Sequence, residues 1–372
     1  MNNNLKNNSV RHSINTTYLW IGLALLVFIC SFFPHWVGSY YSSGVFQYLG
    51  WLLRTLSGFI EIPLGEWVYL FLLILLIIRF IHSLYAFKNK FKTQNFRFNF
   101  IHFFKKLLFR LVQLYVVFML LWGLNYRKTS VAEKLHLKVD TSYSEVQLDS
   151  LSVAIIHSLN SCRQNIPDSV IQKLSYAKVF DQAIQQTRLM PQKFTLSTLN
   201  KPVLKKASFP FWGDYLGYLA FYQPITGEAI IRTDVPILTL PFTSSHELAH
   251  QMGYASETEA NFIAYIIAMH SKDSIFKYSM LLQMFTYSQS AHLSMIAASG
   301  NFEKWKEVVN RNKNLLDPKV YRDRKLIKDF FNQRQHLLIP ASSSLYDQFL
   351  QWNKQAKGIK SYDEVLLWVL AY

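Results

Sequence analysis

Long apolar stretches are concentrated in the first third of the chain, and polar residues are interspersed at shorter spacing after it. Three stretches are long enough to cross a hydrocarbon core of ~30 Å as helices: residues 17–33, 63–81 and 107–126. The last one ends in Trp122 and Tyr126, which are residue types enriched at membrane boundaries. The pattern therefore predicts a membrane domain over residues 1–126 with three transmembrane helices.

Positive charge is concentrated between the second and third stretches. No acidic residue lies between His82 and Arg110, and seven basic residues do: Lys88, Lys90, Lys92, Arg97, Lys105, Lys106 and Arg110. Lys and Arg are enriched in cytoplasmic loops, so we expect this loop inside, together with Lys6 and Arg11. Three spans then place residues 127–372 outside the cytoplasm. Arg127 and Lys128 argue against this orientation, but they are two positive charges against the seven of the loop.

Composition agrees with a membrane protein and argues against a nucleic-acid-binding protein and a disulfide-rich one. Apolar types make up 51% of the 372 residues and charged types 17%, below the roughly 25% of soluble proteins. The net charge of +16 would be compatible with nucleic-acid binding. However, no basic stripe interleaved with aromatic residues forms a recognisable binding module, so we expect no nucleic-acid partner. Cys30 and Cys162 are the only cysteines and imply no disulfide framework.

From Thr129 onward the pattern indicates an α+β domain that is mostly helical with a small β-sheet. Apolar residues recur at helical period in 146–159, after a Ser144 and Gln147 capping pair. Residues 219–223 and 228–233 flank a Pro224–Gly227 turn and predict a hairpin. Further helices are expected to start near Thr243, Glu257, Ser274 and Asp317, with a last one over 362–370.

The residues His246-Glu247-Leu248-Ala249-His250 carry the HExxH pattern on one of these helices. Residues four apart share a helix face, so His246 and His250 can bind one zinc ion. Glu247 then stands beside the water that such an ion activates, and is the candidate general base for attack on a peptide carbonyl. We therefore expect Zn²⁺ as cofactor and a peptide or protein as substrate.

Two downstream carboxylates, Glu257 and Glu259, are candidates for the third ligand. They lie two residues apart on a helix and cannot both face the metal. The face of Glu257 also carries Asn261 and small residues, which favours close helix packing and a supporting hydrogen bond from Asn261. We therefore prefer Glu257 and keep Glu259 as the alternative. Gly253 is expected to end the first helix and return the chain.

Two interpretations that involve no metal compete with the metal site. A pattern with three fixed positions can arise by chance in a helical protein. Alternatively, Ser244 and Glu247 form a capping box, with both histidines on a polar face. The second interpretation explains Glu247 but not two histidines at ligand spacing.

The residues Glu257-Thr258-Glu259-Ala260-Asn261 resemble the second-helix motif of gluzincin metallopeptidases, in which a ligand Glu is followed four residues later by Asp. Here Asn261 replaces that Asp, and the spacer from His250 to Glu257 is shorter than in thermolysin-like enzymes. More closely, residues 222–229, 233–236 and 240–251 resemble an uncharacterised bacterial membrane-protein family, a domain of unknown function with N-terminal spans and a zincin-like region. The resemblance covers nearly the whole chain and implies a fold and a metal site, not a substrate.

The hairpin before the HExxH helix suggests how a substrate is held. In zincins the strand preceding this helix pairs with an extended substrate at a sheet edge, and Glu228 to Arg232 is the candidate edge. Packing of the sheet against helices explains the same residues equally well. For oxyanion stabilisation the spacing does not choose among Tyr222, Arg232 and a later tyrosine.

Together these patterns predict a multi-pass protein of the bacterial inner membrane with a periplasmic zinc metallopeptidase domain. An intramembrane protease is disfavoured because the HExxH region is too polar for lipid. A metal-bound domain that binds peptide or envelope material without cutting it stays open, as does a metal-free structural or assembly protein. The sequence does not indicate an oligomeric state.

Overall fold

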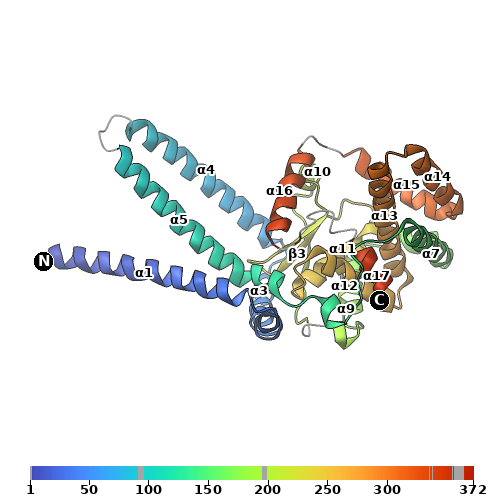
Figure 1. The fold of residues 1–372 in the computed structure, drawn as a ribbon, viewed down its shortest axis with the longest axis horizontal. Coiled ribbons are helices and arrows are strands. Elements are labelled where there is room, and N and C mark those ends of the chain that lie inside the picture. The colour runs from blue at the N-terminus through green and yellow to red at the C-terminus, as the bar shows by residue number, and fades with distance from the viewer. Residues whose placement is uncertain are drawn as a thin grey trace.

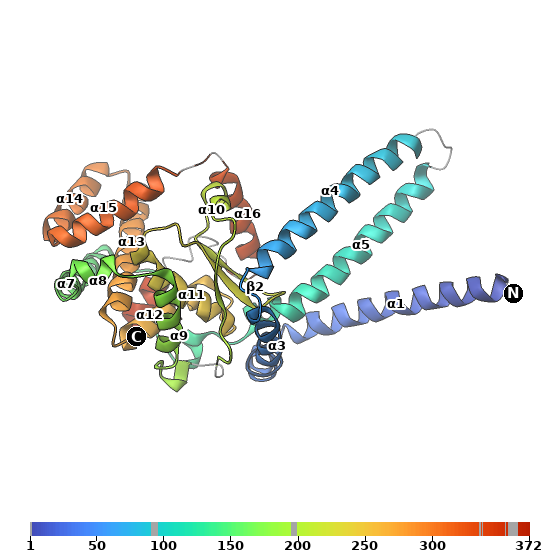
Figure 2. The same cartoon turned by 180° about the vertical axis from the view of Figure 1, so that it is seen from behind.

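The computed structural model describes residues 2–90, 96–194, 199–334, 336, 338–353, 355 and 364–372. Three long helices extend from one side of a globular, mostly helical part (Figures 1 and 2): α1 (Asn2–Cys30), α4 (Leu64–Lys90) and α5 (Phe96–Leu121). Between α1 and α4 the chain forms α2 (Pro34–Trp36), the π-helix η1 (Val37–Val45) and α3 (Phe46–Gly58). Two residues on which predictions fall, Lys92 of the basic loop and Tyr362 of the last helix, lie outside the described residues.

One helix among the described residues, over Leu64–Tyr85, is long and apolar enough to cross a membrane. Thr16–Cys30 and Pro34–Gly58 meet the same criterion together, with a bend of 101° between them. The prediction for 63–81 thus falls on the clearest candidate span. Neither of the other two expected spans, 17–33 and 107–126, meets the criterion by itself among the described residues. α1 ends at Cys30 rather than residue 33, and α5 ends at Leu121, followed by the 3-10 helix η2 (Gly123–Arg127). Gly123 allows this close turn, because a Cβ there would lie 2.6 Å from Met119 Sδ.

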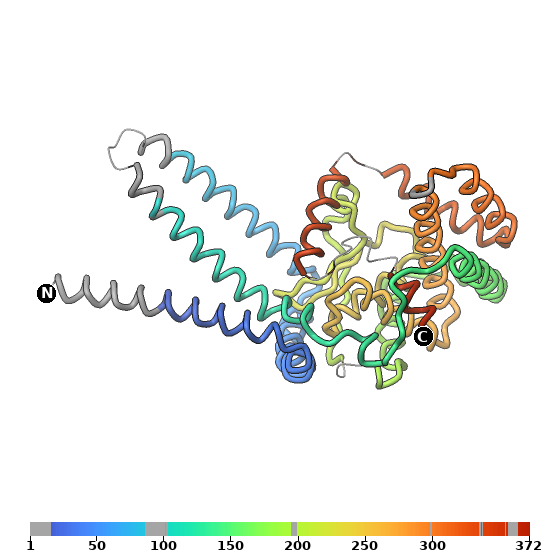
Figure 3. Tube along the Cα trace, in the orientation of Figure 1, coloured from blue at the N-terminus to red at the C-terminus, as the bar shows by residue number. Residues whose placement is uncertain are grey.

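The globular part consists of helices around a small sheet, and its trace can be followed in Figure 3. Its shorter helical elements are α6 (Val131–Lys134), α8 (Asp168–Gln172), η3 (Gln192–Phe194), α10 (Phe211–Leu216), η4 (Ile237–Thr239) and α17 (Val365–Ala371). Its longer helices are α7 (Glu145–Gln164), α9 (Tyr176–Thr187), α11 (Leu240–Gln251), α12 (Glu257–His270), α13 (Ser274–Ser299), α14 (Phe302–Leu315), α15 (Pro318–Asn332) and α16 (Ile339–Trp352).

Most of the sequence-based helix starts are confirmed. The capping box of Ser144 and Gln147 begins α7, and α12 and α13 begin at Glu257 and Ser274. Asp317 caps α15 with its side chain. The helix expected from Thr243 begins earlier, at Leu240, because Pro241 lies in the first turn, where its missing N–H costs no hydrogen bond.

The sheet has three strands in the order β1-β3-β2. The predicted hairpin is confirmed as β2 (Ala220–Gln223) and β3 (Glu228–Ile231), which pair antiparallel with Tyr222 opposite Ala229. Strand β1 (Leu204–Lys206), which the sequence pattern did not predict, pairs parallel with β3 on its other side. β3 is therefore the central strand, and all four of its residues are buried.

Segments from both sides of the expected 126/127 domain boundary share one apolar cluster. Val37, Tyr41, Phe46 and Trp122 are buried against Ala255, and Tyr222 packs against the same cluster. The N-terminal segment between α1 and α4 thus packs against the globular part through this cluster, whereas the largest apolar cluster consists of residues from Val131 onward.

A buried ion pair reinforces this connection at the start of α4. Lys205 Nζ contacts the Glu228 carboxylate and donates to the carbonyl oxygens of Ser57, Ile60 and Ile62 at 2.6–2.9 Å. The Glu228 carboxylate accepts in turn from the backbone N–H groups of Leu64 and Gly65, at 3.2 and 2.7 Å. Both charges therefore serve to hold the candidate membrane helix on the sheet.

Candidate metal centre

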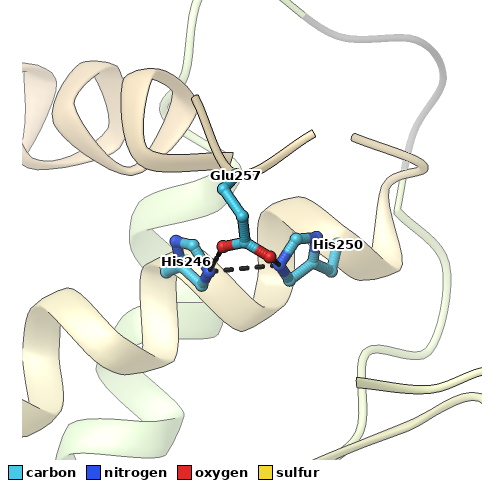
Figure 4. A group of neighbouring side chains, drawn as sticks. All are labelled: His246, His250 and Glu257. Carbon is cyan, nitrogen blue, oxygen red and sulfur yellow. Dashed lines mark hydrogen bonds and ion pairs between the residues drawn. The ribbon is translucent and has the colours of Figure 1, made fainter. Parts of the chain in front are cut away.

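Helices α11 and α12 carry the HExxH pattern and the downstream carboxylates, and Gly253 makes the sharp turn between them possible. Gly253 has φ of 94°, a left-handed conformation that a side chain disfavours. It follows directly on the end of α11, as expected from the sequence. The turn brings the first residue of α12, Glu257, back over the histidine face of α11 (Figure 4).

His246, His250 and Glu257 form a cluster in which one candidate ligand atom from each lies within 4.8 Å of the others. The Nε2 atoms of the two histidines are 3.1 Å apart. Glu257 Oε2 lies 3.3 Å from His246 Nε2, and Glu257 Oε1 lies 3.8 Å from His250 Nε2. Tetrahedral zinc with bonds of ~2.0–2.2 Å separates its ligands by roughly 3.3–3.5 Å, so these spacings fit a zinc ion.

Hydrogen bonds on the outer side of each imidazole orient the rings. His250 Nδ1 lies 2.7 Å from the carbonyl oxygen of Tyr254, which can only accept, so Nδ1 carries the hydrogen. His246 Nδ1 lies 2.8 Å from Oδ1 of Asn261 and donates in the same way. Both Nε2 atoms are therefore left with a lone pair directed at the Glu257 carboxylate. This is the arrangement by which neighbouring groups orient metal-binding histidines.

Carboxylate oxygens at and next to the cluster have no hydrogen-bond donor within the described part of the chain. Among the described residues, Glu257 Oε2 and Glu247 Oε2 are buried and have no hydrogen-bond partner. Two imidazole lone pairs and a carboxylate oxygen converge on one point, which calls for a positive charge between them. His, His and Glu are a donor set that catalytic zinc sites use. The residues present therefore fit a zinc ion.

The pKa values of the three side chains also indicate that the cluster attracts a positive charge. Burial and the neighbouring His246 lower the pKa of His250 to about 4. Burial opposes the charge of Glu257, but its close approach to His246 and His250 outweighs burial and holds the pKa of its carboxyl at about 2. Burial also works against protonation of His246, yet Glu257 and Glu247 raise its pKa. Without a metal, a proton on His246 supplies the positive charge that the cluster attracts.

Glu247 lies one residue from His246 on α11 and does not cap the helix. Ser244 and Glu247 both fall inside α11, which begins at Leu240, so the capping-box interpretation is wrong. Burial raises the pKa of the Glu247 carboxyl to about 8, with smaller effects from His246 and Glu257. A cation at the cluster would favour the carboxylate form that a general base requires.

The two candidate carboxylates of α12 have different surroundings. Glu257 faces the histidines, whereas Glu259 forms a buried ion pair with Lys128 and accepts from the backbone N–H of Val131 at 2.9 Å. The geometry thus places Glu257 in the cluster and Glu259 outside it. Asn261 lies at His246, the position expected for a supporting residue.

Residues remote in sequence complete the surroundings of the cluster. Tyr346 of α16 donates to Glu257 Oε1 at 2.7 Å, and Gln355 accepts from the Glu257 backbone N–H at 3.0 Å. The Trp122 ring lies edge-on to His250, with centroids 5.8 Å apart, and Phe242 lies at the same distance from His246. The side chains of His246 and His250 are only 12% and 9% exposed. The sequence leaves a later tyrosine open only as an oxyanion stabiliser, and no local pattern marks Tyr346 as a hydrogen-bond partner of Glu257.

The prediction that Glu228 to Arg232 forms a substrate-binding edge is wrong. β3 is the central strand, with β1 and β2 occupying both of its sides, so it offers no free edge. Glu228 is paired with Lys205. Arg232 is buried between Asp214 and Asp234, at 2.6 and 2.8 Å. These charges stabilise the fold around the sheet.

The fold and the cluster define a mostly helical chain with at least one membrane-capable helix and a candidate metal centre on two consecutive helices. The chain belongs to the family described as "Protein of unknown function (DUF3810)", whose family model matches residues 41–370. No curated protein and no solved structure matches the chain. The match begins within η1 and so includes most of the segment between α1 and α4, α3 among it.

Proposed function

We propose that this protein is a membrane-anchored zinc metallopeptidase that hydrolyses peptide bonds. The observation that carries the proposal is the convergence of the Nε2 atoms of His246 and His250 on the Glu257 carboxylate. Glu247 is adjacent to His246 on α11, and its buried Oε2 has no hydrogen-bond partner among the described residues. A structural site would need no such neighbouring carboxyl. A zinc ion held there supplies a Lewis acid that polarises a carbonyl and lowers the pKa of a water molecule.

The protein's own residues have separate roles in this proposal. His246, His250 and Glu257 hold the ion, while Asn261 and the Tyr254 carbonyl keep the imidazoles turned toward it. Glu247 takes the proton of the attacking water and passes it to the leaving amine. Tyr346 keeps the Glu257 carboxylate in place.

We further propose the three-span topology for the anchor, with α1, α4 and α5 crossing the bacterial inner membrane and the globular part in the periplasm. The extension of α1, α4 and α5 from the same side of the globular part supports it, with α4 and α5 side by side and α1 at an angle to them (Figure 1). The basic residues around the α4–α5 connection support a cytoplasmic position for that end.

A second candidate function is binding of peptide or envelope material at the same metal site without hydrolysis. The low exposure of His246 and His250, which have Trp122 and Phe242 against their rings, favours it, because a substrate carbonyl must come into contact with the ion to be hydrolysed. The metal site is common to both candidates, and only turnover separates them.

The test uses the full-length protein in lipid nanodiscs, since the membrane segment contributes to the core. Zinc content is measured by mass spectrometry, and a peptide library is digested with the wild type and with Glu247→Gln. We expect about one zinc per chain in both proteins and a rate of cleavage lower by roughly 10²–10⁴-fold in the variant. No cleavage by a zinc-loaded wild type would support the binding function, and equal cleavage by both proteins would remove Glu247 from the mechanism.

A further inference from the structure

An exposed apolar surface covers α10 and the adjoining side of α16. We call it the α10–α16 face and define it by six residues that are 38–77% exposed: Phe211, Trp212, Tyr215, Leu216, Leu345 and Trp352. The two helices are joined by a hydrogen bond of 3.0 Å from the Ser342 hydroxyl to the Leu216 carbonyl oxygen. Leu345 and Trp352 are seven residues apart and so lie on one side of α16. Monomeric soluble proteins seldom expose so many large apolar side chains together.

A continuous row of aromatic rings connects this face to the beginning of α4. Trp67 of α4 packs on Phe209 with centroids 5.3 Å apart. Phe209 contacts Phe211 at 6.4 Å, and Phe211 contacts Trp212 at 5.1 Å. The row therefore runs without interruption from a candidate membrane helix onto α10.

The position of Trp67 along α4 sets the depth of this row. The candidate span Leu64–Tyr85 has 22 residues. At 1.5 Å per residue it is ~33 Å long, close to the thickness of the hydrocarbon core. Trp67 lies three residues inside it, ~4.5 Å from its beginning. Rings that pack on Trp67 lie at the depth where Trp and Tyr are enriched in membrane proteins.

The same depth follows from α5 on the other side of the face. Phe349 of α16 packs edge-on against Phe118 of α5, with centroids 6.1 Å apart. Phe118 precedes the end of α5 at Leu121 by three residues. Figures 1 and 2 show α10 and α16 on the side of the globular part from which α4 and α5 extend. Two separate contacts thus place the face at the domain-side ends of two long helices.

The charges on these helices agree with contact to lipid. Neither α10 nor α16 contains a basic residue, and their only carboxylates are Asp214 and Asp347. Asp214 is held by Arg232, and Asp347 accepts from Gln351 at 2.7 Å. The exposed side of the face is therefore apolar and aromatic.

We propose that the α10–α16 face lies in the membrane–water boundary, where lipid covers it and holds the metal centre at the membrane surface. The proposal rests on the proposed membrane anchoring by α4. It follows that α16 contacts lipid on one side and presents Tyr346 to Glu257 on another.

Site-directed spin labelling of the full-length protein in nanodiscs tests the proposal. In a background with Cys30→Ser and Cys162→Ser, single cysteines replace Trp212, Leu345, Leu76 or Val146, and each is labelled with a nitroxide. Leu76 lies within the α4 candidate span and is 67% exposed. Val146 is the matched control, because it is an apolar residue on α7 that is 75% exposed (Figure 1). Accessibility to oxygen and to a water-soluble nickel complex is measured at each label.

We expect the ratio of oxygen to nickel accessibility at Trp212→Cys and Leu345→Cys to be several-fold higher than at Val146→Cys, and closer to that at Leu76→Cys. Equal ratios at 212, 345 and 146, with a lipid-exposed label at 76, would overturn the proposal and leave the anchoring intact. Shielding of 212 and 345 from both reagents would assign the face to a protein partner and also overturn it. A water-exposed label at 76 would refute the anchoring itself. Trp352→Cys replaces either position if a variant does not fold.

Discussion

The hydroxyl of Tyr346 donates a hydrogen bond of 2.7 Å to Glu257 Oε1, across 89 residues of sequence. The bond connects α16 to the carboxylate that completes the candidate zinc site. Groups in this supporting position commonly change metal affinity by ~10–100-fold when they are removed.

We therefore expect Tyr346→Phe to weaken zinc binding by roughly 10–100-fold without unfolding the protein. The ring keeps its packing against Phe349, since only the hydroxyl is lost. Competition with a chromophoric zinc chelator measures the affinity. Tyr321→Phe, on α15, is the matched control and should bind zinc like the wild type. Equal affinity of the wild type and Tyr346→Phe would remove the hydroxyl from the support of the site.

Glu257→Gln and Glu259→Gln should separate loss of the metal from loss of stability. The first change removes a ligand charge, so we expect zinc to be lost from a folded protein. The second leaves Lys128 buried without its partner, which typically costs about 3–5 kcal/mol, while folded molecules keep their zinc. Zinc content and the thermal unfolding midpoint are measured on the same samples. If Glu259→Gln lost the zinc and Glu257→Gln retained it, the third ligand would be Glu259.

Lys205→Met should destabilise the whole protein, including the metal site. Glu228 would remain as a buried charge without its cation, at a cost of about 3–5 kcal/mol in the free energy of unfolding. The exposed neighbour Lys206→Met is the control, with an expected effect within about 0.5 kcal/mol. Denaturant unfolding in detergent micelles measures the difference. Similar midpoints for both variants would show that the pair contributes little.

A fragment of residues 127–372 should not fold into a zinc-binding domain. It lacks Val37, Tyr41, Phe46 and Trp122, whose removal leaves a cavity against Ala255 and Tyr222. Size-exclusion chromatography should show aggregates, whereas the full-length protein in detergent elutes as one species. A soluble fragment with one zinc per chain would mean that the membrane segment is dispensable for the core.

Reporter fusions test the proposed topology. A fusion at Asn89, next to the basic α4–α5 connection, should report the cytoplasm, and a fusion after Tyr372 should report the periplasm. Alkaline phosphatase is active only in the periplasm and a fluorescent protein such as GFP only in the cytoplasm, so the two reporters give opposite signals at each position. The same compartment for both fusions would show that α5 does not cross the membrane and would overturn the three-span topology.

Local sequence patterns predicted much of the centre because its geometry is largely local. The four-residue spacing of His246 and His250 and the turn at Gly253 depend on backbone geometry within about a dozen residues. The preference for Glu257 over Glu259 came from the residues sharing its helix face, and the structure has Glu257 at the histidines. The capping box of α7 could be predicted for the same reason.

The remaining features depend on contacts between distant segments. β1 pairs with β3 in parallel, which requires a crossover that no turn motif announces, and this pairing makes β3 central instead of an edge. Glu228 looked available to a substrate because its partner, Lys205, lies on another strand. The boundary at 126/127 followed hydropathy, which does not reveal that Tyr41 and Trp122 pack into the globular core.

The distance along the chain between Glu257 and Tyr346 has a consequence for biosynthesis. The ribosome makes both histidines and Glu257 well before α16, and the hydroxyl that holds the carboxylate emerges 89 residues later. A chain that is still being translated therefore carries a candidate centre whose carboxylate lacks its hydroxyl donor until α16 has been made.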